Sequence, residues 1–182
     1  MPGMDVRDTR VVVRMARPEE YDAVGELTVE VYVGEGYVRA ASPYVAELAD
    51  PARRAASTRI LVATHADRIV GSLTVARPGT PYAETALPGE LEFRMLAVAK
   101  SGRGLGAGTS LVRSVIDLAR AEGFAAVALT TMPAMVEARR IYDRLGFLPI
   151  PSRDWRTSLG HPLHVLRLPL DPDARESSDR VS

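Results

Sequence analysis

Apolar and polar side chains alternate along residues 91–98, and apolar side chains return at helical spacing from residue 107 onward. A period of two is typical of a half-buried strand, and a period near 3.6 is typical of an amphipathic helix. The strand face expected to be buried carries Leu91, Phe93, Met95 and Ala97. The helical stripe carries Leu111, Val112, Val115, Ile116 and Ala119. We therefore expect a strand, a short turn and a helix, around which the rest of the chain is organised.

The same patterns predict the other elements. Strands are expected at residues 11–15, 59–64, 69–76, 124–131 and 164–170. Helices are expected from Pro18 to Gly34, at residues 43–56 with a break near Asp50 and Pro51, and from Met132 to Leu145. Residues 77–90 read as a long loop and residues 147–155 as irregular chain. This order predicts an α/β fold with one mixed sheet. Along the chain we expect a flexible leader at residues 1–10, a single domain at 11–170 and a disordered tail at 171–182.

Composition narrows the class of protein. The 182 residues are 46% hydrophobic and 25% charged, which is ordinary for a soluble domain. Lys plus Arg equals Asp plus Glu at 23 each, so no net charge favours nucleic acid or an anionic membrane. The chain has no cysteine, which excludes thiolate metal sites and an acyl-cysteine intermediate. No apolar run approaches about 18 residues, and the first residues are charged, so we expect a cytoplasmic protein.

Four glycines, Gly102, Gly104, Gly106 and Gly108, alternate through the turn between the strand and the helix. Without side chains at these points, backbone N–H groups could converge on an anion at the positive end of the helix. The expected ligand is a phosphate or pyrophosphate, and a purely structural turn is the alternative.

One interpretation of the turn is the dinucleotide fingerprint G-x-G-x-x-A over Gly102, Gly104 and Ala107. A dinucleotide site also needs an acidic residue at the end of the next strand to bind a ribose. Residues 125–131 contain none. A dinucleotide-binding oxidoreductase therefore stands as a weaker alternative.

A second interpretation covers much more of the chain. Arg103-x-x-Gly106-x-Gly108 resembles the [QR]-x-x-G-x-[GA] signature of the GNAT acetyltransferase superfamily, and the segments EFRMLAV and YDRLGF resemble flanking family segments. The resemblance extends over about residues 11–170. It implies a mixed, mostly antiparallel sheet flanked by helices and splayed at an acetyl-CoA cleft. It also implies an N-acetyltransferase that transfers an acetyl group from acetyl-CoA to a primary amine by direct attack in a ternary complex.

The resemblance also implies which residues would hold the cosubstrate. Backbone groups of Leu96, Ala97 and Val98 would bind the pantetheine arm as an added strand does. Arg103 itself could instead be a solvated surface arginine. The backbone around the pyrophosphate would come from Arg103, Gly104, Leu105, Gly106, Ala107, Gly108 and Thr109.

Two residues are candidates for proton transfer. Glu92 lies among apolar neighbours, which should raise its pKa, and it matches the family's strand glutamate, so it is the candidate base. The alternatives are a structural ion pair with Arg94 or the absence of a dedicated base. Tyr142 matches the tyrosine that protonates the leaving thiolate, although its spacing alone fits a core tyrosine.

The sequence departs from the family pattern at Met135, where an asparagine is common, and at Thr130 and Thr131, where some members have an acid. A non-catalytic acyl-CoA-binding or regulatory module is therefore the main alternative. No metal is expected, because His65, His161 and His164 lack suitable ligand neighbours.

The acceptor is expected to be a primary amine of a small molecule, peptide or protein. Neither nucleic acid nor membrane is expected as a partner, and a homodimer is compatible with the sequence. Its pocket is expected from residues 32–45, 77–90 and 149–160, with Trp155 as a pocket wall or a packing anchor. Acidic residues in or beside these segments favour a cationic amine, namely Glu30, Glu35, Glu84, Glu90 and Asp154.

Overall fold

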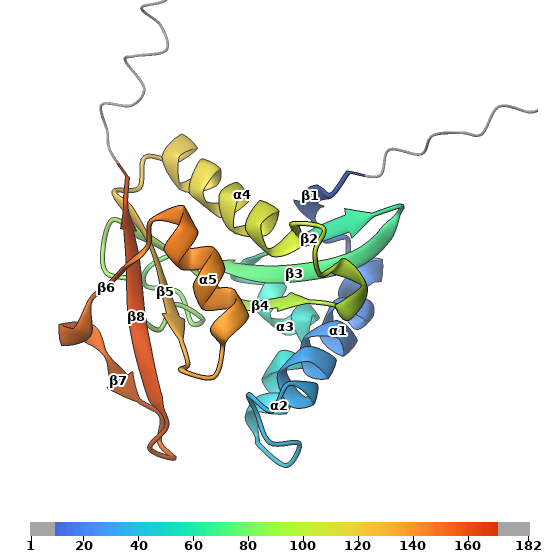
Figure 1. The fold of residues 1–182 in the computed structure, drawn as a ribbon, viewed down its shortest axis with the longest axis horizontal. Helices are drawn as coiled ribbons and strands as arrows, with labels where there is room; N and C mark the ends of the chain where they lie inside the picture. Colours follow the sequence, from blue (N-terminus) through green and yellow to red (C-terminus); the bar gives the residue numbers. More distant parts are fainter. Residues whose placement is uncertain (1–9, 171–182) are drawn as a thin grey trace, which may run out of the picture. The chain divides into compact units, whose positions relative to one another are not determined.

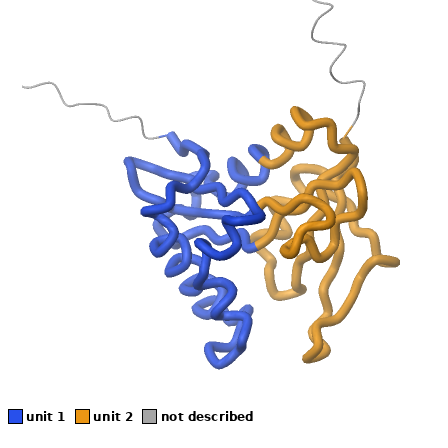
Figure 2. The backbone as a smooth tube through the Cα atoms, turned by 180° about the vertical axis from the view of Figure 1, so that it is seen from behind, with its two compact units in different colours: residues 1–74, 95–114 blue, residues 75–94, 115–182 orange. Residues whose placement is uncertain are grey.

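Figure 1 shows the computed structural model, which describes residues 10–170. The expected disordered tail, and the expected leader apart from Arg10, lie outside the described residues. Contacts divide the chain into two compact units, coloured in Figure 2. Unit 1 runs up to Thr74 and includes residues 95–114, and unit 2 consists of residues 75–94 and the described chain from Val115 onward. Strand β4 (Glu90–Val98) and helix α4 (Ala107–Ala121) contribute residues to both units.

The strands of unit 1 follow one another in the order β1, β2, β3 and the second half of β4. β1 (Val12–Met15) pairs antiparallel with β2 (Arg59–His65). β2 continues into β3 (Arg68–Ala76) through Ala66 and Asp67, which have positive φ values of 49° and 63°. Two positive φ values in a row match the tight turn of a hairpin.

The helices of unit 1 begin with the single turn η1 (Pro18–Glu20) and α1 (Tyr21–Gly34). Two short helices follow, α2 (Tyr44–Leu48) and α3 (Pro51–Ala55). The break predicted near Asp50 is confirmed, because the Asp50 carboxylate accepts the Arg53 N–H at 3.0 Å and caps α3. α1 approaches this region so closely that a Cβ on Gly25 would lie 2.6 Å from the Ala49 carbonyl oxygen.

The strands of unit 2 follow the order β4, β5, β8 and β6, and β7 also pairs with β8. β5 (Ala126–Thr131) is parallel to β4, in a ladder that ends at Glu92 opposite Ala128. β8 (Pro162–Pro169), β6 (Leu148–Pro149) and β7 (Trp155–Arg156) form antiparallel pairs. Helix α5 (Val136–Leu145) lies across one face of these strands (Figure 1).

Helix α4 follows the short turn η2 (Lys100–Gly102). All members of its predicted apolar stripe are buried. The helix ends at Ala121 and is followed by Gly123, whose φ is +80°, and the Phe124 N–H closes the end on the Ala119 carbonyl at 2.9 Å. Within residues 10–170, no helix combines the length and apolar character needed to cross a membrane.

Some predicted details were wrong. Residues 90–93 are buried on both faces, so the first part of β4 is not half-buried. Met95 in the same strand has a positive φ of 56°, a local irregularity that alternation could not predict. Residues 147–155 contain β6 and the single turn η3 (Pro151–Arg153), and the last strand begins at Pro162 rather than His164.

The start of α5 was also predicted wrongly. The helix begins at Val136 instead of Met132, after a turn in which the Met135 N–H bonds the Met132 carbonyl at 3.0 Å. Pro133 lacks an N–H and fits a first helical turn equally well as a bend. The sequence could not distinguish these two uses of proline.

Candidate functional site

The glycines of the turn serve two different purposes. Gly102 is required by packing, because an added Cβ would lie 2.7 Å from the Val70 Cβ. Gly104 and Gly106 have positive φ values of 78° and 76°, and an added Cβ at either would meet nothing within 4 Å. The backbone of these two residues is therefore open on the side where a side chain would stand. An open glycine backbone before a helix is the arrangement expected of an anion site.

The first N–H groups of α4 provide the donors for such a site. The Ser110 N–H closes the first helical bond on the Gly106 carbonyl at 2.9 Å. Among residues 10–170, no backbone carbonyl accepts from the N–H groups of residues 106–109. These N–H groups are available to a ligand, as at any uncapped helix start. By contrast, the N–H groups of Arg103 and Leu105 bond Lys100 and Gly102 carbonyls at 3.3 and 3.4 Å.

The Arg103 side chain pairs with Glu35, just after α1, with 2.5 Å between nitrogen and oxygen. This hydrogen bond holds the pKa of the Glu35 carboxyl below its usual value. The side chain of Arg103 is 47% exposed, so it fits the surface-arginine alternative in this structure.

Leu96, Ala97 and Val98 lie beyond the part of β4 that pairs with β5. On the side of β3, an added Cβ at Gly71 would lie 3.2 Å from the Ala97 carbonyl oxygen. The predicted pantetheine residues and the predicted pyrophosphate residues therefore belong to the same compact unit.

Glu92 belongs to unit 2 and is only 1% exposed. Its Oε2 accepts the backbone N–H groups of Thr85 and Ala86 at 3.1 and 3.2 Å. Its Oε1 is buried and has no hydrogen-bond partner within the described chain. Burial raises the pKa of Glu92, opposed by the two N–H groups and by the charge of Arg94. A carboxyl with a raised pKa and one uncommitted oxygen has the properties of a general base.

Arg94 bonds the loop that precedes β4. Its Nη2 lies 3.0 Å from Glu84 Oε1, and its Nη1 donates to the Tyr82 carbonyl at 3.0 Å. The charge of Arg94 still acts on Glu92, but Glu92 receives its hydrogen bonds from the loop backbone. The role of Glu92 as a base stays a prediction.

Tyr142 is 4% exposed and belongs to a cluster of three aromatic rings that contact one another. Its ring centre lies 5.8 Å from that of Phe93 and 5.8 Å from that of Phe147. The ring therefore has the packing expected of a core tyrosine. Phe93 is the neighbour of Glu92 in β4, so Tyr142 approaches the strand on the face opposite to the Glu92 side chain.

Sequence reasoning did not identify Thr85 and Ala86 as contacts of Glu92, nor Arg153, whose Nη2 donates to the Thr85 carbonyl at 2.7 Å. These contacts come from loops without a motif, so no local signal could have identified them. Residues 10–170 contain no cluster of three potential metal ligands, and His164 instead bonds Asp154 at 2.8 Å. The Trp155 Nε1 is buried without a partner among the described residues, which fits either role considered for this side chain.

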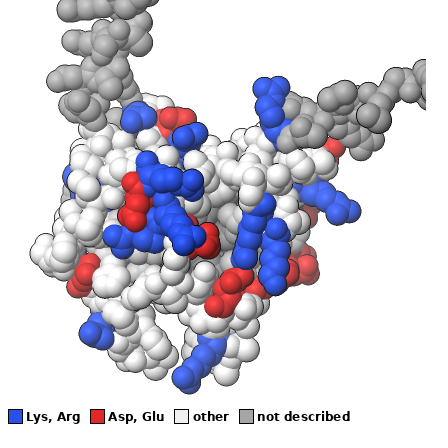
Figure 3. Space-filling view, viewed as in Figure 1, with Lys and Arg blue, Asp and Glu red and all other residues white. Residues whose placement is uncertain are grey.

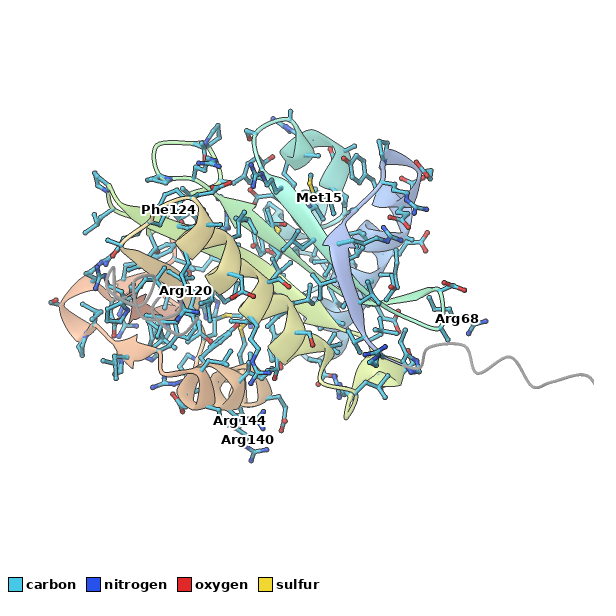
Figure 4. All side chains as sticks on the ribbon, turned by 90° about the horizontal axis from the view of Figure 1, so that it is seen from above. Met15, Arg68, Arg120, Phe124, Arg140 and Arg144 are labelled. Atoms are coloured by element: carbon cyan, nitrogen blue, oxygen red, sulfur yellow. The ribbon has the colours of Figure 1, made fainter. Side chains whose placement is uncertain are left out.

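Four of the five acidic residues that favoured a cationic acceptor have basic partners. Glu35 pairs with Arg103, Glu84 with Arg94, Glu90 with Arg153 and Arg167, and Asp154 with His164. Figure 3 likewise shows acidic side chains beside basic ones on the face drawn. On α5, the labelled side chains of Arg140 and Arg144 project outward from the helix (Figure 4). Because four of the five acids are paired, charge gives a cationic acceptor much weaker support than the sequence suggested.

The chain was compared with known proteins. The model of the acetyltransferase (GNAT) family matches residues 22–147. A probable N-acetyltransferase, camello, from Xenopus tropicalis is 38% identical over 80 residues, which are 44% of this chain and 34% of that protein. The chain thus spans about a third of the length of this curated relative.

Solved structures show the same fold. A GCN5-related N-acetyltransferase from Kribbella flavida is 27% identical, with a TM-score of 0.67 over 88% of this chain and 98% of that one. A Salmonella typhimurium protein solved with its cofactor acetyl-CoA is 18% identical, with a TM-score of 0.63 over 88% and 94% of the two chains. The expected mixed α/β fold, an open sheet flanked by helices, is confirmed. Because the family model covers more than half of its residues, the chain belongs to the acetyltransferase (GNAT) family.

Proposed function

We propose that this protein is an N-acetyltransferase that moves the acetyl group of acetyl-CoA directly to a primary amine. The observation that carries the proposal is Glu92, a buried carboxyl with a raised pKa and an unpartnered Oε1. A module that only binds acyl-CoA has no need for such a group, because burying a carboxyl without full hydrogen bonding costs stability. An enzyme that must remove a proton from an amine does need one.

Acetyl-CoA fits the turn before α4. The open backbone at Gly104 and Gly106 and the N–H groups of residues 106–109 would bind its pyrophosphate. Leu96, Ala97 and Val98 would bind the pantetheine arm through backbone groups. The Salmonella typhimurium protein, which has the same fold, was solved with acetyl-CoA as its cofactor, and this supports the assignment.

In the proposed reaction, Glu92 takes a proton from the acceptor ammonium, directly or through a water molecule. The neutral nitrogen then attacks the thioester carbonyl. An amide bond forms as the carbon–sulfur bond breaks, and the nitrogen releases its second proton to solvent. Tyr142 donates its phenolic proton to the departing thiolate and is reprotonated from solvent. A phenol with a pKa near 10 is well matched to a thiolate of similar basicity.

A second candidate is a non-catalytic acyl-CoA-binding module. It is favoured by Met135, which stands where the family commonly has an asparagine. The Met135 Sδ accepts the Thr131 hydroxyl at 3.8 Å, so in this structure the side chain is engaged within unit 2. The two candidates differ in whether bound acetyl-CoA is turned over.

The test is thiol release from acetyl-CoA with a panel of spermidine, tryptamine, glycinamide and a lysine tetrapeptide, together with calorimetry of coenzyme A binding. We expect binding, and thiol release that requires at least one amine. Binding without turnover of any amine would favour the module. Absence of binding would contradict both candidates. We further propose that the protein is cytoplasmic. Size-exclusion chromatography would decide whether it is a monomer or a homodimer.

A further inference from the structure

Thr85 links the side chains of Glu92 and Thr130. Its N–H donates to Glu92 Oε2 at 3.1 Å, and its hydroxyl lies 2.6 Å from the hydroxyl of Thr130. Thr85 comes from the loop before β4, whereas Thr130 is near the end of β5. A single loop residue thus contacts the candidate base and the neighbouring strand.

The pairing of the strands places Glu92 and Thr130 on one face. Glu92 stands opposite Ala128 in the parallel ladder, and paired residues direct their side chains to the same face. Thr130 is two residues further along β5 and therefore also lies on that face. The ladder between β4 and β5 ends at Glu92 and Ala128, before Thr130 is reached. Beyond that point, the Thr130 hydroxyl contacts the hydroxyl of Thr85 from the loop.

Thr85 is held at all three of its polar groups. Besides the bonds of its N–H and hydroxyl, its carbonyl accepts Arg153 Nη2 at 2.7 Å. Arg153 is in turn held by Glu90 at 2.8 Å, and Glu90 also accepts Arg167 Nε at 2.6 Å. The position of the Thr85 hydroxyl is therefore fixed by the loop, by η3 and by β8.

Thr85 and Thr130 are more exposed to solvent than the candidate base beside them. Glu92 is 1% exposed, whereas Thr85 and Thr130 are half-buried. When one hydroxyl donates to the other, the second keeps its hydrogen, and both keep acceptor capacity. The pair can therefore accept a hydrogen bond from an N–H group.

We propose that the hydroxyl pair of Thr85 and Thr130 orients the acceptor amine beside Glu92. This inference rests on the proposed function. The pair accepts a hydrogen bond from the ammonium, and a water molecule passes the proton to Glu92 Oε1. The ammonium gives one proton to the water, the water gives one to the carboxylate, and the products are a neutral amine and a protonated Glu92.

Two kinds of substitution separate the effect of losing the hydroxyl from the effect of changing side-chain packing. Thr130→Val keeps the shape and removes the hydroxyl, whereas Thr130→Ser keeps the hydroxyl and removes the methyl group. The same two changes are made at Thr85. Thr131→Val is the matched control, because Thr131 is the next residue of β5, lies on the other face and donates its hydroxyl hydrogen bond to Met135 Sδ.

Each variant is assayed with the panel amine that the wild type acetylates fastest. We expect both valine variants to lose about tenfold in kcat/KM for the amine, the effect of one hydrogen bond to a charged group, with KM for acetyl-CoA unchanged. The serine variants should stay within about threefold of wild type, as should Thr131→Val. The double valine variant should lose little more than either single one, because both hydroxyls act as one pair.

The outcomes that overturn the inference are distinct from those that overturn the function. A wild-type protein that acetylates no amine would contradict both the proposed function and the role of the hydroxyl pair. An active wild type with fully active valine variants, or with serine variants as impaired as the valines, would remove the hydroxyl pair alone. A high-resolution crystal structure gives a readout without turnover: we expect a water molecule within hydrogen-bond distance of Glu92 Oε1, and a dry Oε1 would contradict the proton route.

Discussion

The guanidinium of Arg94 is bound to Glu84, with 3.0 Å between Nη2 and Oε1. Glu92, two residues before Arg94 in the same strand, is bound instead by the loop N–H groups of Thr85 and Ala86. The two residues interact through the charge of Arg94, which opposes the rise in the pKa of Glu92 without cancelling it. In this arrangement Glu92 is a buried carboxyl whose Oε1 has no hydrogen-bond partner among the described residues.

Substitution of Glu92 should change the pH dependence of activity. Glu92→Gln cannot accept the proton, so we expect kcat/KM for the amine to fall about a hundredfold or more, most strongly below the pKa of the amine. Arg94→Met keeps the base but removes a charge that lowers the pKa of Glu92, so the acid limb should move to higher pH. Rate profiles from pH 5 to 9 test both changes, and an unaltered profile for Glu92→Gln would exclude it as the base.

The raised pKa of Glu92 also has a consequence for stability. A carboxyl whose pKa is higher in the folded state stabilises the fold at low pH, and this contribution is lost as the pH rises through the folded value. Glu92→Gln has no such dependence. Its melting temperature relative to wild type should therefore increase from about pH 4 to pH 8. A difference that stays constant with pH would contradict the raised pKa.

The backbone of Gly106 should control coenzyme A binding. Gly106→Val places a branched side chain on a residue with φ +76°, on the open side of the turn, so affinity should fall at least about tenfold. Gly123→Val is a matched control, because Gly123 has a φ of +80°, also has nothing within 4 Å of an added Cβ and ends the same helix. Both variants should lose similar stability. Calorimetry showing equal affinities would place the cofactor elsewhere.

Tyr142→Phe should slow turnover without weakening acetyl-CoA binding. The ring keeps its packing against Phe93 and Phe147, and only the hydroxyl, the proposed proton donor, is lost. We expect kcat to fall about a hundredfold. Tyr21→Phe, which removes a half-buried hydroxyl at the start of α1, serves as the control and should leave kcat unchanged. A loss under about threefold for Tyr142→Phe would not support its role as acid.

Glu90 should matter for stability more than any surface acid. It is 3% exposed and accepts hydrogen bonds from Arg153 and Arg167, which lower its pKa although burial raises it. Glu90→Gln should cost about 2 kcal/mol, a discounted value because both arginines are partly exposed. A lowered pKa means that the contribution is present above about pH 4.3 and is lost as the pH falls through the folded value.

The control for Glu90 is Glu137→Gln. Glu137 pairs with Arg140 in an exposed i,i+3 contact on α5, where both side chains are more than half exposed. Exposed pairs of this kind contribute little to stability, so this variant should be as stable as the wild type. Equal losses in the two variants, measured by urea unfolding at pH 7, would contradict a structural role for the Glu90 contacts.

The sequence by itself determined the parts of this protein that depend on local chemistry. Residues 91–118 carry their own periodicity, and Gly106 and Gly123 stand where the backbone must have a positive φ, so the strand, turn and helix could be predicted. The family signature in the same turn indicated acetyl-CoA. That residues 11–170 form a single domain stays a prediction, as do the roles of Glu92 and Tyr142.

Only the tertiary structure decided what surrounds Glu92. The carboxyl is bound by a loop, residues 77–89, that has no periodicity, and this loop is held by Arg153, 68 residues away in the sequence. Burial on both faces of β4 likewise depends on neighbours that are distant along the chain. Hydrogen bonds between remote segments form only when the chain is packed, so neither the partner of Arg94 nor the pairing of Thr85 with Thr130 is encoded in any local pattern.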